Sequence, residues 1–491
     1  MSRPSLLLHR RAFIAGSAAA GSVAVSSRGI AAASPWEPMA RAFVAAVNDR
    51  AARGGFVSAW MSEAARKRRP ADEWNADFEK VLQVSGGLDY VGVRQGPREQ
   101  LVTVRARRQA RERDVIAIPD RHTPDKLWAV MTIAHPTAYD AALLDRPASR
   151  AELREAIDQR LRFAVERDEF RGALRVCAPD GTAVYEAGFG RADGASGPAI
   201  TPDSRLHLGS ADKSFTALMI GRHFDAGRLK PDTTLAEVLP RWPNRKAAEA
   251  ITIRHLLTHS AGLGDLWSRP GYDKTAPYTR VTELLPYFWE ADPAFAPGTS
   301  SAYSNEGFVV LGAVLEAVGE GTWYDQLDRQ VYRPAGMLRS GHFNGADAFE
   351  GKVVGYRYGE DDVLGLTARR SNRDFAGFRG NSCGGGYSTV RDMTGYLRAL
   401  HAGALLPRAR ADAMSARAEG GLRGYGMGFQ NAAVGGRTVR GHGGGGSNSG
   451  IDGDSWVVWE TGWTCSILGA YDAPFTQAIS EDLKVMLAAQ A

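Results

Sequence analysis

Residues 209–215 place a hydroxyl side chain and an amine side chain on one helical turn. Ser210 and Lys213 are three residues apart, and such positions share a helix face with Cβ atoms about 5–6 Å apart. Lys213 can therefore take the proton from Ser210 as the hydroxyl attacks a carbonyl carbon. The apolar residues of the helix predicted over 210–226 indicate that it is buried at the centre of a domain. The spacing by itself also fits an ordinary surface serine and lysine.

Two downstream segments favour a catalytic interpretation. Tyr303 and Asn305 lie at the entrance of a helix predicted over residues 306–319, where they offer a phenol for proton transfer and an amide that can orient Lys213. Near the C-terminus, His442 precedes four glycines and a strand-like run at 454–460. A glycine-rich strand edge lets a substrate lie against the backbone, where a free N–H can stabilise an oxyanion. The order of the three segments is typical of an acyl-transfer site.

These segments resemble the serine β-lactamase and penicillin-binding-protein superfamily, in its class C-like branch that contains esterases and D-aminopeptidases. The matching positions are Ser210 and Lys213 for S-x-x-K, Tyr303 and Asn305 for Tyr-x-Asn, and His442, Gly443 and Gly444 where many relatives carry Lys-Thr-Gly. The likeness extends from about residue 152 to the C-terminus. It implies an α/β fold, in which an antiparallel sheet is flanked by helices beside an all-helical subdomain. It implies neither a cofactor nor a metal.

The resemblance also implies a mechanism. Ser210 would form an acyl-enzyme, with Lys213 and Tyr303 sharing the general-base role. The backbone N–H groups of Ser210 and Gly445 would hold the oxyanion, and Asn305 would position the lysine and the substrate carbonyl.

Two departures from the family pattern bear on the substrate. His442 replaces a lysine that helps hold the substrate carboxylate in β-lactam-processing relatives, and an imidazole is largely neutral at pH 7. Gly443 lacks the hydroxyl of the usual threonine, while Gly444 keeps the glycine. These changes favour a small ester or amide substrate. A D-amino-acid peptidase or carboxypeptidase, a weak β-lactamase, and a non-hydrolytic sensor of cell-wall peptides are the alternatives.

A second serine motif competes with the first. Gly380, Ser382 and Gly384 fit the G-x-S-x-G pattern of the nucleophile elbow, which needs a buried strand before it and a helix directly after it. The preceding residues 371–379 are polar and rich in arginine. We therefore expect a glycine-rich turn that leads to a helix near residues 390–401, with Ser388 or Thr389 as its N-cap.

Histidine spacing suggests one further site. His255 and His259 are four residues apart, as in a metal-binding pair, but no H-E-x-x-H pattern accompanies them. We expect both imidazoles to bind backbone groups at the end of a short helix over 254–257.

Residues 1–33 have the pattern of a twin-arginine signal peptide. Arg10 and Arg11 precede a moderately apolar run, and three alanines end the segment, so cleavage is expected before Ser34. The run is too short to span a membrane, and no stable membrane anchor is expected after cleavage. A periplasmic or secreted location follows. The formal net charge of +5 includes four arginines of this segment, so the mature chain carries +1, which argues against nucleic-acid binding.

The mature chain is predicted to hold two domains, at residues 34–146 and 147–491. Helices over 39–53 and 71–84 and four apolar runs predict a small α+β accessory domain resembling cystatin-like or NTF2-like folds. The four runs are at 88–94, 101–107, 114–119 and 126–135. A Ser149–Glu152 capping box is expected to open the second domain.

The last strands of the second domain are predicted to join its first two strands in one sheet. Strands at 173–177 and 183–189 should be joined by strands at 455–460 and 462–471, with a final helix over 475–489 and an all-helical insertion ending near residue 339. Three cysteines are too few for a disulfide framework, although one pair is possible and three buried thiols fit equally: Cys177, Cys383 and Cys465. Four aromatic residues are candidates for either the cleft wall or the core: Trp267, Tyr272, Trp289 and Trp323.

Overall fold

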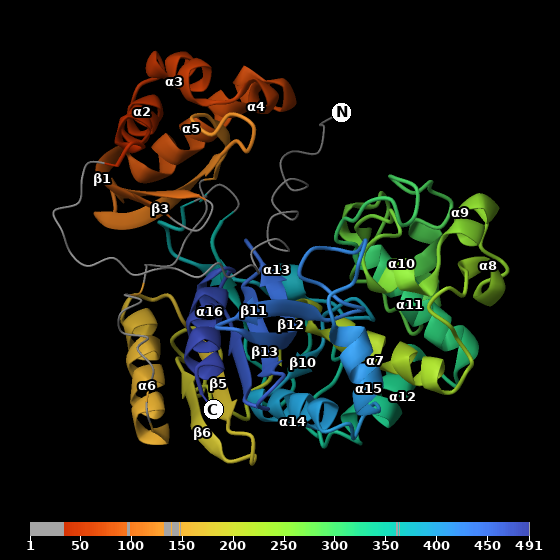
Figure 1. Ribbon diagram of the computed structural model, residues 1–491. Helices are drawn as coiled ribbons and strands as arrows, with labels where there is room; N and C mark the ends of the chain where they lie inside the picture. Colours follow the sequence, from red (N-terminus) through yellow and green to blue (C-terminus); the bar gives the residue numbers. More distant parts are fainter. Residues whose placement is uncertain are drawn as a thin grey trace. The chain divides into compact units, whose positions relative to one another are not determined.

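The computed structural model describes residues 34–95, 99–131, 139, 147, 149–359, 362 and 364–490 (Figure 1). The signal peptide predicted over residues 1–33 lies outside the described residues. Two compact units share the described chain. Of the described residues, those in 147–356 and 371–490 form the large unit, and those in 34–139 and 357–370 form the N-terminal unit.

The N-terminal unit packs four helices on an antiparallel four-stranded meander. The helices are α2 (Glu37–Asn48), α3 (Ala52–Trp60), α4 (Glu63–Arg68) and α5 (Ala71–Ser85), and the strands are β1 (Leu88–Gln95), β2 (Gln100–Ala106), β3 (Arg111–Pro119) and β4 (Leu127–Met131). Phe43, Phe56 and Phe78 meet at the centre of its core, with ring centroids 5.7–6.0 Å apart. The likeness to cystatin-like or NTF2-like folds stays a prediction.

Two expectations for this part of the chain need correction. The single helix expected over 39–53 is two helices, because the Asp49 carboxylate accepts from the Ala51 N–H and turns the chain between α2 and α3. The described residues of the segment 357–370, expected in the second domain, pack with the N-terminal unit. Leu364 and Leu366 are buried in its core, and Arg113 donates to the carbonyls of residues 364 and 365.

The large unit is built on a six-stranded antiparallel sheet in the order β11-β12-β13-β14-β5-β6 (Figure 1). Its strands are β5 (Gly172–Cys177), β6 (Ala183–Phe189), β11 (Gln430–Val434), β12 (Arg437–Gly446), β13 (Ile451–Val458) and β14 (Thr464–Gly469). β14 pairs with β5 from Thr464↔Cys177 to Gly469↔Gly172, so the C-terminal strands do return to the first hairpin. The strand expected at 455–460 begins at Ile451, because the glycine run of β12 pairs with residues 451–454.

Helices cover the sheet. α6 (Arg150–Glu166), capped by Ser149, and α16 (Phe475–Ala488) pack against each other and against β6 and β13 respectively. α14 (Val390–His401) packs on β5, β13 and β14. The remaining short elements of this region are β7 (Leu206–His207), β8 (Tyr356–Arg357), β9 (Arg370–Ser371), α13 (Arg373–Ala376), β10 (Tyr387–Ser388) and α15 (Arg408–Ser415).

The insertion before residue 339 is helical in its described elements, as expected. These are α8 (Leu235–Val238), α9 (Arg245–Ala250), α10 (Ile253–Leu257), η3 (Leu266–Ser268), η4 (Val281–Tyr287), α11 (Asn305–Val318), α12 (Trp323–Leu327) and η5 (Asp328–Tyr332). α7 (Asp212–Asp225) follows the single turn η2 (Gly209–Ala211) and is buried along nearly its whole length. It contacts both β12 and α11, so it lies where the sheet meets the helical region.

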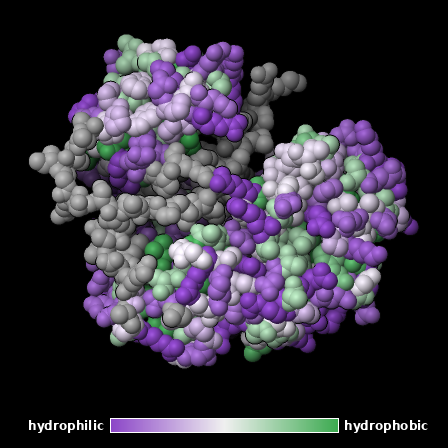
Figure 2. All heavy atoms as spheres, in the orientation of Figure 1, coloured by the Kyte–Doolittle hydropathy of each residue, from purple (hydrophilic) through white to green (hydrophobic). Residues whose placement is uncertain are grey.

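Polar and charged residues are spread over the face of the molecule in Figure 2, with hydrophobic residues scattered among them. Within the described ranges, no helix has the length and apolar character needed to cross a bilayer. The three cysteines are buried free thiols, which decides between the two expectations for them.

Candidate active site

The structure brings Ser210 and Lys213 into direct contact. Ser210 lies in the turn η2, two residues before the start of α7, and Lys213 lies in the first turn of that helix. The Lys213 Nζ atom is 3.1 Å from the Ser210 Oγ atom. Lys213 is fully buried, whereas Ser210 is half-buried. The arrangement sets a half-buried serine beside a fully buried amine.

The other contacts of Lys213 decide what its amine can do. Nζ donates to the Asn305 Oδ1 atom at 2.8 Å and to the carbonyl of Cys383. Both partners are pure acceptors, so each requires an N–H from the lysine. A neutral amine has two N–H groups and one lone pair. In the structure Nζ donates to all three oxygens, as an ammonium does; once neutral, the amine would keep its two N–H groups on Asn305 and Cys383 and turn its lone pair to the Ser210 hydroxyl. Of these three partners, only the Ser210 hydroxyl can donate a hydrogen bond to the lysine nitrogen, which a general base requires.

Asn305 is held at the entrance of α11. It is the first residue of that helix, and the preceding residue, Ser304, is the N-cap, whose hydroxyl accepts from the Gly307 N–H. The Asn305 Nδ2 atom donates to the Asp265 Oδ1 atom at 3.0 Å. The amide therefore bridges Lys213 and Asp265.

Tyr303 presents its ring to the lysine. The Lys213 Nζ atom is 4.9 Å from the ring centroid of Tyr303, and the ring of His259 packs against the same phenol with a tilt of 32° and ring centroids 4.4 Å apart. Among the described residues, no hydrogen bond joins the Tyr303 hydroxyl to Ser210 or Lys213. Of the two residues expected to share the base role, Lys213 alone contacts the nucleophile directly.

The glycine run of β12 lies against the nucleophile turn. A Cβ atom placed on Gly444 would lie 2.3 Å from the Ser210 N atom and 2.1 Å from the Leu208 carbonyl oxygen. Gly209, at φ +55°, also lies close to this strand, since a Cβ there would lie 2.6 Å from the Gly445 N atom. Only residues without side chains permit this approach. It places the backbone N atoms of Ser210 and Gly445 at one junction.

The open edge of β12 also faces this junction. β11 pairs with β12 only as far as Gly441, and the Gly443 N–H donates instead to the Gln430 side chain at 2.9 Å. Alternate N–H groups of a strand point to the same edge. The N–H of Gly445 therefore points away from β13, toward the side on which Ser210 lies.

His442 is buried, and both of its ring nitrogens are hydrogen-bonded within the protein. Its Nδ1 atom lies 2.5 Å from the Gly443 carbonyl oxygen, so Nδ1 carries the proton, and the Tyr425 hydroxyl donates to Nε2 at 2.7 Å. Burial, with a smaller contribution from the charge of Lys213, lowers the pKa of His442 to about 3. The imidazole is neutral near pH 7 and has no donor left for a substrate carboxylate.

This low pKa predicts an acid-sensitive fold. An unfolded histidine binds a proton below about pH 6.5, whereas folded His442 stays neutral down to about pH 3. Its contribution to stability is complete above pH 6.5 and is lost between pH 6.5 and 3, by about 1.4 kcal/mol per pH unit. The free energy of unfolding of His442→Phe, measured in urea at several pH values, should change less steeply with pH than that of the wild type, by that amount between pH 6 and 4. Above pH 7 the two pH dependences should be the same. Equal slopes below pH 6 would contradict this protonation state.

The competing motifs take structural roles. Ser382 is fully buried in a tight turn, with no strand before it and no helix directly after it, so it is not a nucleophile elbow. Thr389 caps α14 by accepting from the Asp392 N–H, as predicted. His255 and His259 accept backbone N–H groups, the first at the start of α10 and the second from Ser304. Within the described ranges, no group of side chains has the composition of a metal site.

The candidate aromatic residues divide between core and surface. Trp323 is fully buried and donates to Thr216, so it belongs to the core. Trp289 packs against Trp242 in the same core. Trp267 is half-exposed, and its ring contacts Phe378 and Tyr272.

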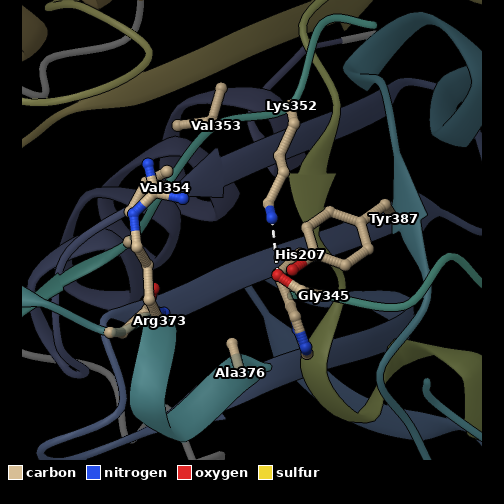
Figure 3. Close-up of a pocket in the computed structure, with 10 residues that line it drawn as sticks. His207, Gly345, Lys352, Val353, Val354, Arg373, Ala376 and Tyr387 are labelled. Carbon is tan, nitrogen blue, oxygen red and sulfur yellow. Dashed lines mark hydrogen bonds between the residues drawn. The ribbon is translucent and has the colours of Figure 1, made fainter. Parts of the chain in front are cut away.

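A small cavity lies beside the strand that precedes the nucleophile turn (Figure 3). Lys352 extends into it and donates to the Gly345 carbonyl, and His207, which accepts from the Gly209 N–H, forms part of its lining. Its volume of about 10 Å³ is room for about one water molecule. The cavity is therefore too small to hold a substrate.

Sequence reasoning missed two parts of the site. The Cys383 carbonyl lies in the G-x-S-x-G segment that was considered for a different role, and Asp265 lies in a loop without a recognisable motif.

Comparison with known proteins identifies the family. The family model described as beta-lactamase matches residues 154–464, more than half of the chain. The chain belongs to the beta-lactamase family. Members of this family include serine hydrolases, and the geometry around Ser210 fits that class of enzyme.

Several curated proteins are similar to this member of the beta-lactamase family. Esterase EstB of Burkholderia gladioli is 30% identical over 362 residues, which cover 66% of this chain and 90% of the esterase. Penicillin-binding protein 4 of Amycolatopsis lactamdurans is 30% identical over 175 residues, covering 34% of this chain and 44% of that protein. This chain thus spans less than half of that relative's length. A D-aminopeptidase of Brucella anthropi is 24% identical over 282 residues, covering 56% of this chain and 51% of that enzyme.

Solved structures of other proteins share the fold. The D-amino acid amidase of Ochrobactrum anthropi SV3 aligns with a TM-score of 0.58 and 21% identity, over 69% of this chain and 98% of the amidase. A penicillin-binding protein from Bacillus halodurans aligns with a TM-score of 0.57 and 24% identity, over 66% of this chain and 98% of that chain. The fold class predicted for the second domain is confirmed.

Proposed function

We propose that the protein hydrolyses small uncharged esters, or closely related amides, through an acyl-enzyme formed on Ser210. The observation that carries the proposal is the set of contacts around the Lys213 amine. Two pure acceptors engage its N–H groups and leave the Ser210 hydroxyl as the one partner with which it can exchange a proton. A buried amine in this arrangement is suited to activate a hydroxyl nucleophile.

The reaction follows from these contacts. Ser210 Oγ attacks the carbonyl carbon of the substrate as its proton moves to the neutral Lys213 amine. The carbonyl electron pair collects on oxygen, where the N–H groups of Ser210 and Gly445 stabilise it. The tetrahedral intermediate then expels the alcohol or amine, which takes the proton back from Lys213, with Tyr303 beside the lysine as a relay. Water repeats the sequence on the acyl-enzyme and releases the acid.

The state of His442 supports an uncharged substrate. A carboxylate in the site needs a cationic or strongly donating partner. Both nitrogens of His442 are engaged inside the protein, so this position supplies neither. The 30% identity to an esterase over most of that esterase's length supports the same substrate class.

A parallel assay of three substrates tests this specificity. We expect many turnovers on a p-nitrophenyl ester, and a kcat/KM for a chromogenic cephalosporin at least about 100-fold lower, since a missing charged partner costs several kcal/mol. D-Alanine p-nitroanilide is the third substrate, and it tests for the D-amino-acid peptidase activity. Preference for the cephalosporin or the anilide would contradict the ester assignment. A single turnover on every substrate would favour the cell-wall-peptide sensor.

We also infer that residues 1–33 direct export by the twin-arginine route and are then removed. The paired arginines and the alanine-rich end support this inference. Expression of the full chain in a bacterium should yield periplasmic protein that begins at Ser34 by intact mass. An Arg10→Lys, Arg11→Lys variant should stay in the cytoplasm, and a periplasmic variant would contradict the route.

A further inference from the structure

We propose that Asp265 is a positioning residue for acylation, because its carboxylate fixes the orientation of the Asn305 amide and thereby directs the Lys213 lone pair to Ser210. The proposal rests on the proposed function, since it concerns the rate at which Ser210 is acylated. Asp265 lies outside the family motifs and does not contact Ser210 or Lys213 through any hydrogen bond described for them.

The amide of Asn305 has two orientations, which differ by a half-turn that exchanges its oxygen and nitrogen. In the structure the Oδ1 atom faces Lys213 at 2.8 Å and the Nδ2 atom faces the Asp265 Oδ1 atom at 3.0 Å. An ionised carboxylate only accepts hydrogen bonds. A half-turn of the amide would bring two acceptors face to face at Asp265, so the carboxylate selects the orientation seen.

The selected orientation matters for the base. With the amide turned, its NH₂ group would face the Lys213 amine and donate to the lone pair of the neutral lysine. That lone pair would then be unavailable to the Ser210 hydroxyl, while the Cys383 carbonyl would still occupy one N–H group. The turned amide would therefore compete with Ser210 for the base, and Asp265 prevents this.

The loop that carries Asp265 is fastened to the helix that begins with Asn305. The Ser304 hydroxyl donates to the Gly264 carbonyl at 2.8 Å, and the Gly264 N–H donates to the Glu306 carboxylate at 2.7 Å. Arg269 binds the same carboxylate through two hydrogen bonds of 2.5 and 2.9 Å. Glu306 is fully buried, and paired hydrogen bonds of this kind fix geometry as well as charge. Asp265 is thus held rigidly opposite Asn305.

Replacing the carboxylate by an amide tests the orientation directly. Asp265→Asn keeps the size of the side chain but allows either orientation at Asn305. We expect acylation by a p-nitrophenyl ester to slow by roughly 10- to 100-fold, with KM nearly unchanged, because the base is misdirected. The matched control is Asp273→Asn, at an exposed position of the next turn whose carboxylate binds Thr275. The control should stay within about twofold of the wild type.

A double-mutant cycle separates positioning from a general structural role. If Asp265 acts only through the amide, then Asp265→Asn should cause no further loss in an Asn305→Ala background. An equal loss in both backgrounds would overturn the proposal, as would an acylation rate of Asp265→Asn within twofold of the wild type.

An exchange variant, which combines Asp265→Asn with Asn305→Asp, tests the same pairing even if Asp265→Asn alone folds poorly. Asn305→Asp alone sets two carboxylates against each other. Combining it with Asp265→Asn restores a donor opposite an acceptor, since an amide at 265 can donate to a carboxylate at 305, which still accepts from Lys213. We expect the combination to acylate at least about tenfold faster than Asn305→Asp alone, the size of effect expected from one charged hydrogen bond.

No recovery in the exchange variant would overturn the role of Asp265. A wild type that fails to acylate Ser210 at all would instead overturn the proposed function itself, and this proposal with it. The two failures are therefore distinguishable within one set of measurements.

Discussion

Lys213→Met is expected to slow acylation of Ser210 by roughly 10²–10⁴-fold, the usual contribution of a general base. Methionine has a similar length but cannot accept a proton from the Ser210 hydroxyl. The substitution leaves the Asn305 Oδ1 atom and the Cys383 carbonyl without their donor, which costs about 1–3 kcal/mol for each group, and it removes an amine from the interior, which offsets part of that loss. Pre-steady-state release of p-nitrophenol measures the acylation rate.

The control for this variant is Lys230→Met, at an exposed lysine just beyond the end of α7. It should acylate at the wild-type rate, and thermal unfolding of both variants shows whether they are folded. A folded Lys213→Met variant with more than a tenth of the wild-type acylation rate would contradict the role of this lysine as the base.

Gly444→Ala is expected to reduce kcat by about 10²–10³-fold, comparable to the loss of one oxyanion donor. The added methyl group would lie 2.1 Å from the Leu208 carbonyl oxygen and 2.3 Å from the Ser210 N atom. Both atoms belong to the backbone, so the clash is relieved only when β12 and the nucleophile turn move apart. That movement separates the two N–H groups that would hold the oxyanion.

Gly446→Ala on the same strand is the matched control for this crowding. A Cβ atom at residue 446 would have only the Ser449 hydroxyl as a neighbour, at 3.9 Å. This variant should keep activity within about twofold of the wild type. Equal activity in Gly444→Ala and Gly446→Ala would show that the close approach of β12 is not needed for catalysis.

Much of the site could be predicted because its members lie in short motifs with local geometry. The i, i+3 spacing of Ser210 and Lys213 needs only one helical turn to bring both side chains together, and the glycines of 443–446 need only a close backbone approach. The sheet closure through β14 and β5 also followed from patterns of apolar residues. Strand and helix boundaries were less accurate, as in β13, where glycine pairing extended the strand.

The missed features depend on contacts between residues far apart in the chain. Asp265 is 40 residues from Asn305, and the Cys383 carbonyl is 170 residues from Lys213. A backbone carbonyl carries no sequence signal, because any residue has one. The same reason applies to the segment 357–370, whose two buried leucines contact helices and strands that precede it by more than 200 residues. Composition gives no indication of which distant core such a short segment joins.

Intact mass after treatment with a fluorophosphonate tests the central claim most directly, with the wild type measured beside Ser210→Ala. We expect one covalent adduct on the wild type and none on Ser210→Ala, since the reagent reacts with a serine whose hydroxyl is activated by a neighbouring base. Ser382→Ala, which changes the buried serine of the competing motif, should be labelled like the wild type. An adduct that persists in Ser210→Ala, or a wild type that stays unlabelled, would contradict the assignment of Ser210 as the nucleophile.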